Sequence, residues 1–265
     1  MKKYSAIQIP FLSFYCKAIY RYACFDWKGT GIAYLFFLLA VSWIPLMVKF
    51  HIVVSDYIQK DAPKIISQIP QITVSHGVAS VDAPQPYSIR DPATQKVLIV
   101  IDTTGKINTL KDTDAVGLVT KSEAVFKKSA VETRSFNFNS LGQFTLNQQK
   151  ITGWLEIVRR YGALIVYLFA VTGSFIFRTI QLLIYAAIGL LFASRCRSKI
   201  SYDSLLRLSA VAVTPCIIVK TILAVTGISL PLAGLWFFFV AMIYLFIGVQ
   251  ESSKDVVATP EGSAL

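Results

Sequence analysis

Two cations stand isolated in long apolar stretches of the chain. Arg178 is the one charge between Tyr161 and Ser194, and Lys220 is the one charge between Leu208 and Gln250. A charge at the centre of a bilayer costs roughly 2.5–3.5 kcal/mol on insertion scales, so such a residue needs a partner or a function. Neither stretch contains an Asp or Glu, and Gln181 is the nearest polar companion of Arg178 in the sequence. We therefore select Arg178, Gln181 and Lys220 as candidates for binding an anionic ligand or lipid.

Two interpretations of these cations are open. In the first, each stem lies along its own helix and the charged head reaches the lipid phosphates. In the second, Arg178 and Lys220 share a cationic pocket between the second, third and fourth spans, where they hold an anionic headgroup, a substrate or an acidic partner residue. A shared pocket requires the two cations to lie at similar depths in the bilayer. They do, because Arg178 lies about 25 Å along its helix from Arg195, and Lys220 lies about 20 Å along its helix from Arg207.

Asp102 is the residue outside these stretches with the strongest resemblance to a catalytic group. It follows the apolar run Val97–Ile101 and precedes Thr103, Thr104 and Gly105. An Asp at the end of a buried strand can act as a phosphoryl-transfer nucleophile. The same residues suit a strand-ending turn, because Asp and Thr side chains bond nearby amides and Gly adopts positive φ. We favour the turn, since Thr104 stands where a second Asp would be needed.

The other residue types that carry chemistry form no recognisable motif. The two histidines, His51 and His76, have no metal-ligand spacing such as H-E-x-x-H, and the four cysteines form no C-x-x-C pair. The sequence has no P-loop, dinucleotide-binding or serine-hydrolase pattern. We therefore predict that the protein is not an enzyme and holds no metal and no cofactor.

The composition indicates a membrane protein. Hydrophobic residues make up 54% of the 265 residues and charged residues 15%, whereas a soluble globule has about 25% charged residues. Gly29 to Val48 is free of charge over a length that crosses a bilayer core of roughly 30 Å. A Gly/Pro break at Gly227–Pro231 divides the last apolar stretch into two spans. The predicted transmembrane helices are 29–48, 161–194 (one long helix), 205–226 and 232–249.

The charge bias predicts the orientation. The net charge is +11, and basic residues concentrate in the arm 1–28 and around the loop 195–204. Both regions are expected in the cytoplasm by the positive-inside rule, which requires 161–194 to cross only once. We therefore predict a multi-pass bacterial inner-membrane protein with cytoplasmic termini and a cytoplasmic tail 250–265. Residues 49–160 are predicted to be extracytoplasmic.

The N-terminal arm is predicted to be amphipathic. Residues 10–25 are expected to form a helix in which Lys17 and Arg21 share one face and apolar side chains, such as Ile19, share the other. This pattern suits a helix on the surface of anionic lipid. A helix that simply leads into the first span explains the pattern as well.

The segment 49–160 is predicted to be a small α+β domain inserted between two spans. Val53–Ser67 is expected to be helical, with Asp61 and Pro63 as a cap or kink. His76-Gly77 is a plausible hairpin turn, and Val97–Ile101 is a candidate central strand because it is continuously apolar. Further strands are expected at 116–119 and 131–138, and a helix from Leu146 into the second span.

The run Val-Leu-Ile-Val-Ile-Asp-Thr-Thr-Gly-Lys from Val97, followed by Gly-Leu-Val-Thr-Lys-Ser-Glu from Gly117, resembles a family of uncharacterised bacterial inner-membrane proteins. That family includes a membrane protein encoded with maltodextrin-utilisation genes. The resemblance extends in layout to most of the chain: basic N-terminus, early span, inserted domain and three later spans. It implies a location and carries over no catalytic residue.

Together these observations predict an α-helical polytopic membrane protein with about four transmembrane helices and an inserted α+β extracytoplasmic domain. We expect this domain to bind a membrane or envelope protein in an accessory, scaffold or sensor role. The alternative is a component of lipid or solute transport that uses the cationic pocket. The expected partners include anionic headgroups of the bilayer and exclude nucleic acid, because the basic residues are dispersed and have no stacking platform.

Overall fold

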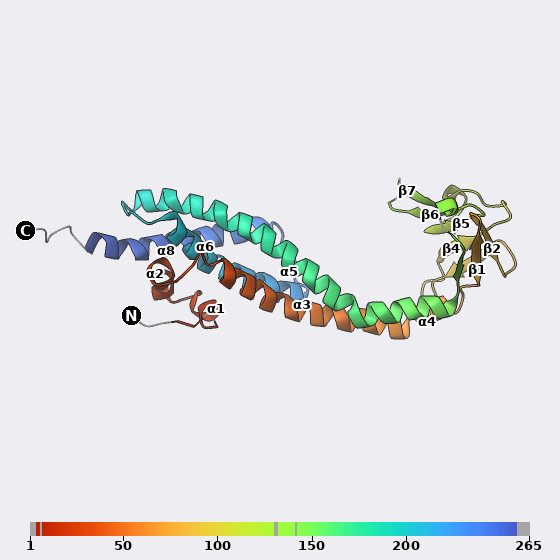
Figure 1. Cartoon of the computed structure of the whole chain (residues 1–265), viewed down its shortest axis with the longest axis horizontal. Coiled ribbons are helices and arrows are strands. Elements are labelled where there is room, and N and C mark those ends of the chain that lie inside the picture. The colour runs from red at the N-terminus through yellow and green to blue at the C-terminus, as the bar shows by residue number, and fades with distance from the viewer. Residues whose placement is uncertain (1–3, 6, 130–131, 141, 259–265) are drawn as a thin grey trace, which may run out of the picture. The chain divides into compact units, whose positions relative to one another are not determined.

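A computed structural model describes residues 4–5, 7–129, 132–140 and 142–258 (Figure 1). It divides the chain into two compact units. The first unit combines residues 1–50 with 163–265, and the second comprises residues 51–162. The ends of the predicted arm and tail, residues 1–3 and 259–265, lie outside the described residues.

Within the described residues, four helical segments are long and apolar enough to cross a membrane: Ile32–Ile66, Gln148–Arg195, Tyr202–Thr226 and Ala233–Lys254. They contain six of the helices, namely α3 (Ile32–Lys60), α4 (Ala62–Ile66), α5 (Gln148–Arg195), α6 (Tyr202–Ala212), α7 (Thr214–Thr226) and α8 (Ala233–Ala258). Many of their large apolar side chains are exposed, Phe169 and Leu191 at 76% and 70% among them. Lipid is the medium that suits such surfaces, because soluble proteins rarely expose large contiguous apolar patches. The predicted fold class, a polytopic helical membrane protein with a small inserted β region, is confirmed.

The third apolar segment is broken rather than continuous. Helices α6 and α7 meet at Val213, and Pro215 lies in the first turn of α7. Proline has no N–H to donate to the carbonyl four residues earlier, so a helix bends or breaks there. Helix α6 begins at Tyr202, before the predicted residue 205, because the Ser201 side chain accepts a hydrogen bond from the Ser204 amide and caps the helix.

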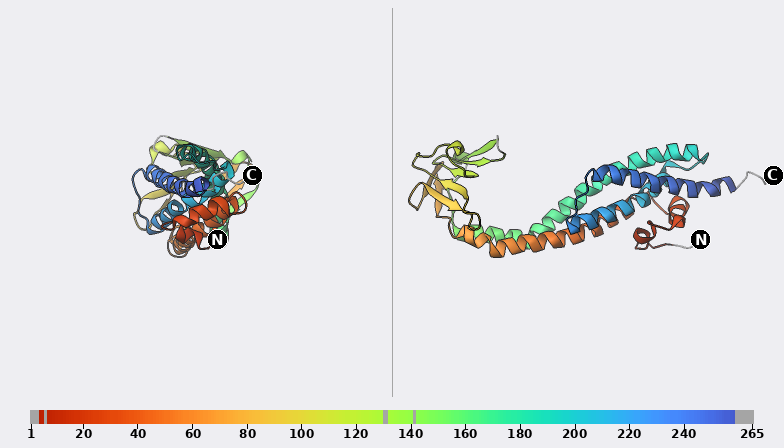
Figure 2. Two further views of the ribbon diagram at one scale, coloured as in Figure 1. Left: turned by 90° about the vertical axis from the view of Figure 1, so that its left-hand side faces the viewer. Right: turned by 180° about the vertical axis from the view of Figure 1, so that it is seen from behind.

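The N-terminal arm differs from the single helix predicted for residues 10–25. It forms two short helices, α1 (Ile9–Leu12) and α2 (Lys17–Phe25). Helix α2 contacts α6 and α8 (Figure 2), and its residues Ile19 and Tyr20 are almost completely buried in the core of the first unit. The Tyr20 hydroxyl donates to the Ser13 carbonyl at 2.7 Å, which fixes the break between the two helices. One face of α2 therefore packs on protein instead of lipid.

The second unit contains the β region, residues 72–146. Its three-stranded sheet has the order β2-β1-β8, and its five-stranded sheet has the order β3-β4-β5-β6-β7. The strands are β1 (Ile72–Ser75), β2 (Val78–Val81), β3 (Tyr87–Arg90), β4 (Val97–Ile101), β5 (Gly117–Val119), β6 (Glu123–Lys127), β7 (Thr133–Asn137) and β8 (Phe144–Leu146). The two sheets share a core around Ile72, Ile89 and Ile101.

The sequence predictions for this region are confirmed at two points. Strand β4 lies between β3 and β5, antiparallel to the first and parallel to the second, so the apolar run is central in its sheet. Strands β1 and β2 form the predicted hairpin. His76 and Gly77 adopt φ of 52° and 77°, as a two-residue turn with left-handed central residues requires.

Other elements were predicted only in part. Strands β5 and β7 fall within the predicted runs 116–119 and 131–138, of which residue 131 lies outside the described residues, whereas β3, β6 and β8 were not predicted. The helix expected over Val53–Ser67 is the end of α3, to Lys60, followed by α4. Asp61 is the N-cap residue of α4 and Pro63 lies in its first turn, so the predicted cap or kink falls between the two helices. Helix α8 extends past residue 249 into the predicted tail.

Candidate functional site: a cationic pocket between apolar helices

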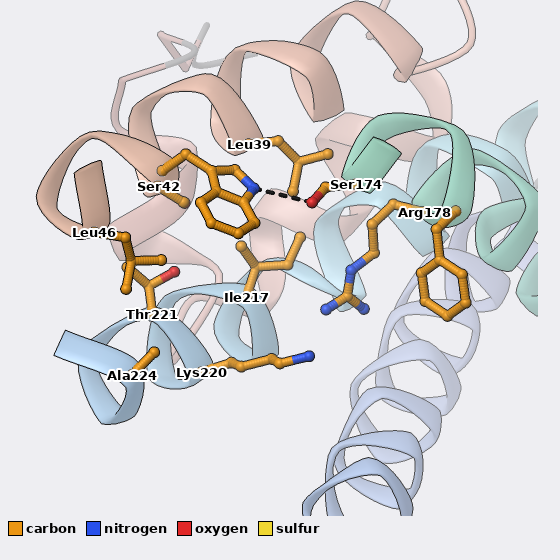
Figure 3. A pocket seen from close by; sticks show the side chains of 11 residues that line it. Leu39, Ser42, Leu46, Ser174, Arg178, Ile217, Lys220, Thr221 and Ala224 are labelled. Atoms are coloured by element: carbon orange, nitrogen blue, oxygen red, sulfur yellow. Dashed lines mark hydrogen bonds between the residues drawn. The ribbon is translucent and has the colours of Figure 1, made fainter. Parts of the chain in front are cut away.

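A pocket of about 240 Å³ lies between α3, α5 and α7 in the first unit (Figure 3). Both candidate cations, Arg178 of α5 and Lys220 of α7, line it. Its other lining residues are mostly apolar, with a few small hydroxyl groups: Leu39, Ser42, Trp43, Leu46, Ser174, Phe177, Ile217, Thr221 and Ala224. The structure thus brings the two cations to one pocket. The helices that form it are those of the first, second and third apolar segments, rather than the second, third and fourth as predicted.

The spacing of the lining residues explains why these three helices form one pocket. Leu39, Trp43 and Leu46 recur at intervals of four and three residues along α3, and Ser174 and Arg178 are four apart on α5. Residues three or four apart lie on the same face of a helix. Each helix therefore presents one face to the pocket.

Arg178 is oriented by a short chain of polar side chains. Its Nη1 donates to Oε1 of Gln181 at 2.5 Å, and Nε2 of Gln181 donates to the Tyr185 hydroxyl at 2.6 Å. Gln181 does not line the pocket itself. A guanidinium carries five N–H groups, and within the described chain this is its one hydrogen bond. The remaining donors of Arg178 are therefore available to a ligand.

Lys220 has no hydrogen bond or ion pair among the described residues, and its side chain is exposed. Its side chain and the Arg178 guanidinium extend toward the same side of the pocket in Figure 3. The apolar stretches that contribute Arg178 and Lys220 hold no Asp or Glu. Two like charges that share a site of low dielectric repel each other, so the pocket favours the arrival of a negative charge.

Hydrogen bonds between helices hold the walls of the pocket. Nε1 of Trp43 donates to Oγ of Ser174 at 3.0 Å, which ties α3 to α5 across the pocket. The Tyr167 hydroxyl donates to the Ala40 carbonyl at 3.0 Å. Trp43 and Ser174 were not among the site residues predicted from the sequence. The position of Ser174 one turn before Arg178 is a signal that could have identified it.

Asp102 serves as the cap of a turn. Its side chain is completely buried, and its Oδ1 accepts from the amide and hydroxyl of Thr104 at 2.9 and 2.5 Å. Its Oδ2 accepts from the Ile107 amide at 2.6 Å. Burial by itself would raise the pKa of Asp102, but these hydrogen bonds to the carboxylate outweigh it and lower the pKa. These hydrogen bonds within the turn are those expected of a residue that caps it.

The remaining predicted residues are dispersed. Lys17 is exposed and Arg21 is half-buried on α2. His76 lies in the β1–β2 turn, where its Nδ1 is 3.1 Å from the Ser75 hydroxyl, and His51 lines a separate cavity of the second unit. Within the described chain, no three His, Cys, Asp or Glu residues are grouped so that they could hold a metal ion.

The four apolar segments, with a β region inserted between the first and the second, define a multi-pass membrane protein of mixed architecture. The chain belongs to the DUF1189 family, described as a protein of unknown function, whose model matches residues 10–249. No curated protein and no solved structure matches the chain.

Proposed function

We propose that this membrane protein binds an anionic lipid, or another anionic amphiphile, in the pocket between α3, α5 and α7. One observation carries the proposal: Arg178 and Lys220 line the same pocket, and their apolar stretches offer no carboxylate to neutralise them. Each cation is costly within the apolar part of a bilayer, and a phosphate group between them would offset both costs with hydrogen bonds to charged groups.

The pocket suits an amphiphile because some of its lining side chains are polar or charged and the others are apolar. The charged heads and the hydroxyls of Ser42 and Thr221 fit a polar headgroup, whereas Leu46, Phe177 and Ala224 fit an acyl chain. A lipid held in this way is consistent with a component of lipid handling or with a sensor of anionic lipid. Snorkelling of two independent side chains predicts no such shared ligand.

The experiment compares lipid retention by the purified full-length protein and its variants in native mass spectrometry. The double variant Arg178→Met, Lys220→Met keeps the stems and removes both charges, and we expect it to lose a tightly bound anionic lipid. Arg195→Met, a change at the last residue of the same helix α5 and outside the pocket, is the matched control and should retain the lipid. Equal retention by both variants would contradict the proposal.

The proposed orientation keeps both termini in the cytoplasm and residues 49–160 outside it, in a bacterial inner membrane. The concentration of basic residues in the arm 1–28 and around 195–204 supports this orientation. A cysteine introduced at Gly105 should react with a thiol reagent that cannot cross the membrane when the reagent is added to intact cells. Reaction only after the cells are lysed would reverse the orientation.

A second candidate function is the binding of a partner protein by the inserted domain, in an accessory or scaffold role. Strand β7 supports it, because β7 lies at the edge of the five-stranded sheet and all five of its residues are exposed. Phe136 of β7 is 59% exposed and contacts Phe126 edge to face, with ring centroids 6.3 Å apart. Exposed edges pair readily with another strand. The implied link to maltodextrin-utilisation genes stays a prediction of the resemblance.

A photo-crosslinking residue at Phe136 of the full-length protein tests this candidate. It should capture one discrete partner in cells, whereas the same residue at the exposed Lys96 of the same unit should not. Identical capture patterns at the two positions would argue against a specific surface.

A further inference from the structure

The second unit contains a polar cavity of about 530 Å³. Residues of α3 and of α5 line it: His51, Ser55 and Gln59 from α3, and Glu156, Arg159 and Arg160 from α5. All six side chains are polar or charged, in contrast to the mostly apolar pocket of the first unit. We name this the polar cavity.

The sequence places these side chains on one face of each helix. His51, Ser55 and Gln59 are four residues apart along α3, and the residues between them are mainly apolar. Glu156, Arg159 and Arg160 are spaced by three and one along α5. Side chains three or four residues apart share a helical face, so α3 presents an uninterrupted polar stripe to the cavity.

Ser55 has a buried hydroxyl with no hydrogen-bond partner in the described chain. Some other helical hydroxyls of this protein donate to the carbonyl four residues earlier, as Thr152 does to Gln148 at 2.8 Å and Ser253 to Val249 at 2.7 Å, whereas Ser209 and Ser252 of the first unit do not. Ser55 could make the same bond to His51, and it does not. A buried polar group without a partner costs folding free energy. We therefore expect a ligand or a water molecule in the cavity to accept a hydrogen bond from the Ser55 hydroxyl.

The charges of the polar cavity favour an anion. Arg159 donates to Glu156 at 2.7 Å, which neutralises one guanidinium. Arg160 has no carboxylate partner among the described residues; its Cζ lies 5.8 Å from the centre of the Tyr161 ring. The cavity therefore keeps one uncompensated guanidinium, beside the imidazole of His51 and the hydroxyl of Ser55.

Two of these residues, His51 and Arg160, lie where the apolar stretches end. His51 follows Val48 by three residues, and Arg160 directly precedes Tyr161. At 1.5 Å per residue these distances are about 1.5–4.5 Å along a helix, and the headgroup layer on each side of a bilayer core is roughly 5–7 Å thick. The charged end of the cavity is thus at the level of lipid phosphates.

We propose that the polar cavity binds a phosphate ester, with a phospholipid headgroup as its source. The unpartnered Ser55 hydroxyl, the uncompensated Arg160 guanidinium and the depth of the cavity near the lipid phosphates support this proposal. Arg160, Ser55 and His51 donate to the phosphate oxygens. Glu156 orients Arg159 and accepts from a hydroxyl or ammonium group of the headgroup. The site is separate in residues and in chemistry from the pocket of Arg178 and Lys220.

Native mass spectrometry of the delipidated full-length protein tests this inference by titration with three probes. The probes are phosphatidylglycerol, diacylglycerol with the same chains, and glycerol 3-phosphate. We expect phosphatidylglycerol to bind and diacylglycerol not to bind, since only the former carries phosphate. Binding of glycerol 3-phosphate with similar affinity would identify a free phosphate ester as the source, and its failure to bind would identify the lipid.

Two sets of variants make the test specific. Arg159→Gln with Arg160→Gln, and Ser55→Ala alone, should each weaken phosphatidylglycerol binding by roughly 10-fold or more, as expected for loss of a hydrogen bond to a charged group. Arg134→Gln, at an exposed arginine of β7, is the control and should bind as the wild type does.

Ser55→Ala also distinguishes a ligand site from a hydrated gap. A ligand site loses affinity for phosphatidylglycerol when this hydroxyl is removed, whereas a cavity that holds only water does not. Unchanged affinity in Ser55→Ala and in the double arginine variant would overturn the inference. The variant Arg178→Met, Lys220→Met should keep this binding event, so failure of one site is distinguishable from failure of the other.

Discussion

Replacement of Asp102 by Asn tests the role of this buried carboxylate as a turn cap. The amide keeps one oxygen for the Thr104 donors, but its NH2 group then faces the Ile107 amide, which donates to Oδ2 at 2.6 Å in the wild type. Two donors then face each other, and the Ile107 amide loses its partner. Hydrogen bonds to charged groups contribute about 1.5–3 kcal/mol, and a buried unsatisfied donor costs about 1–3 kcal/mol. We expect a local loss of about 3 kcal/mol.

Amide hydrogen exchange of the full-length protein measures this loss where it occurs. A loss of about 3 kcal/mol corresponds to roughly 100-fold faster exchange, confined to peptides that cover β4, its turn and β5. Asp82→Asn is the matched control, because Asp82 is exposed and its side chain makes no hydrogen bond within the described chain; its exchange should not change. Exchange in Asp102→Asn that equals the wild type would refute the assignment of Asp102 as a cap.

The lowered pKa of Asp102 gives this prediction a pH dependence. The folded state holds the carboxylate more tightly in its charged form than the unfolded state does. Its contribution is therefore present above the unfolded pKa of about 3.9 and is lost as the pH falls through the lower folded value. The difference in thermal stability between wild type and Asp102→Asn should be constant from about pH 5 to 7 and should shrink below about pH 4. A difference that grows in acid would contradict the direction of the shift.

Two further predictions concern the packing of the N-terminal arm, and both use the melting temperature of the full-length protein. A Cβ at Gly248 would lie 2.8 Å from Cδ1 of Tyr20, so Gly248→Ala should cost about 1–3 kcal/mol, whereas Gly234→Ala, with open space around it, should be neutral or slightly stabilising. Arg207 donates to the carbonyl of Cys24 in the last turn of α2 at 3.0 Å, and to the carbonyls of Trp27 and Gly29 beyond it at 2.5 and 3.5 Å. Arg207→Met should therefore expose the arm to protease, and Arg195→Met should not. Equal melting temperatures of the two glycine variants, or equal protease sensitivity of the two arginine variants, would show that these contacts do not hold the arm.

Much of the membrane architecture could be predicted from local sequence. A helix in lipid satisfies its backbone hydrogen bonds internally, so a long apolar run is sufficient to indicate one. The strand β4 and the β1–β2 hairpin were predictable for a similar reason, because Val97–Ile101 and His76-Gly77 each carry a strong local signal. The strands β3, β6 and β8 have three to five residues and weak patterns, and their pairing partners stabilise them more than their own composition does.

The arm shows where local reasoning was insufficient. The helix predicted from its periodicity was correct in part. Periodicity identifies an apolar face of a helix, but it does not identify whether protein or lipid covers that face. Protein covers this face in α2, because Gly248 of α8 leaves room for the Tyr20 ring. The residue that makes this packing possible lies more than two hundred positions away in the sequence.

The candidate site divides in the same way. The sequence determined that Arg178 and Lys220 are isolated cations in apolar stretches, since charge and hydropathy are properties of the residues themselves. Only the tertiary structure decided that they line one pocket, with Trp43 and Ser174 in its walls, because α3, α5 and α7 meet through faces whose partners are distant in sequence. Depth along a helix follows from a rise of about 1.5 Å per residue. The rotation of each helix toward its neighbours is decided by the packing of all of them together.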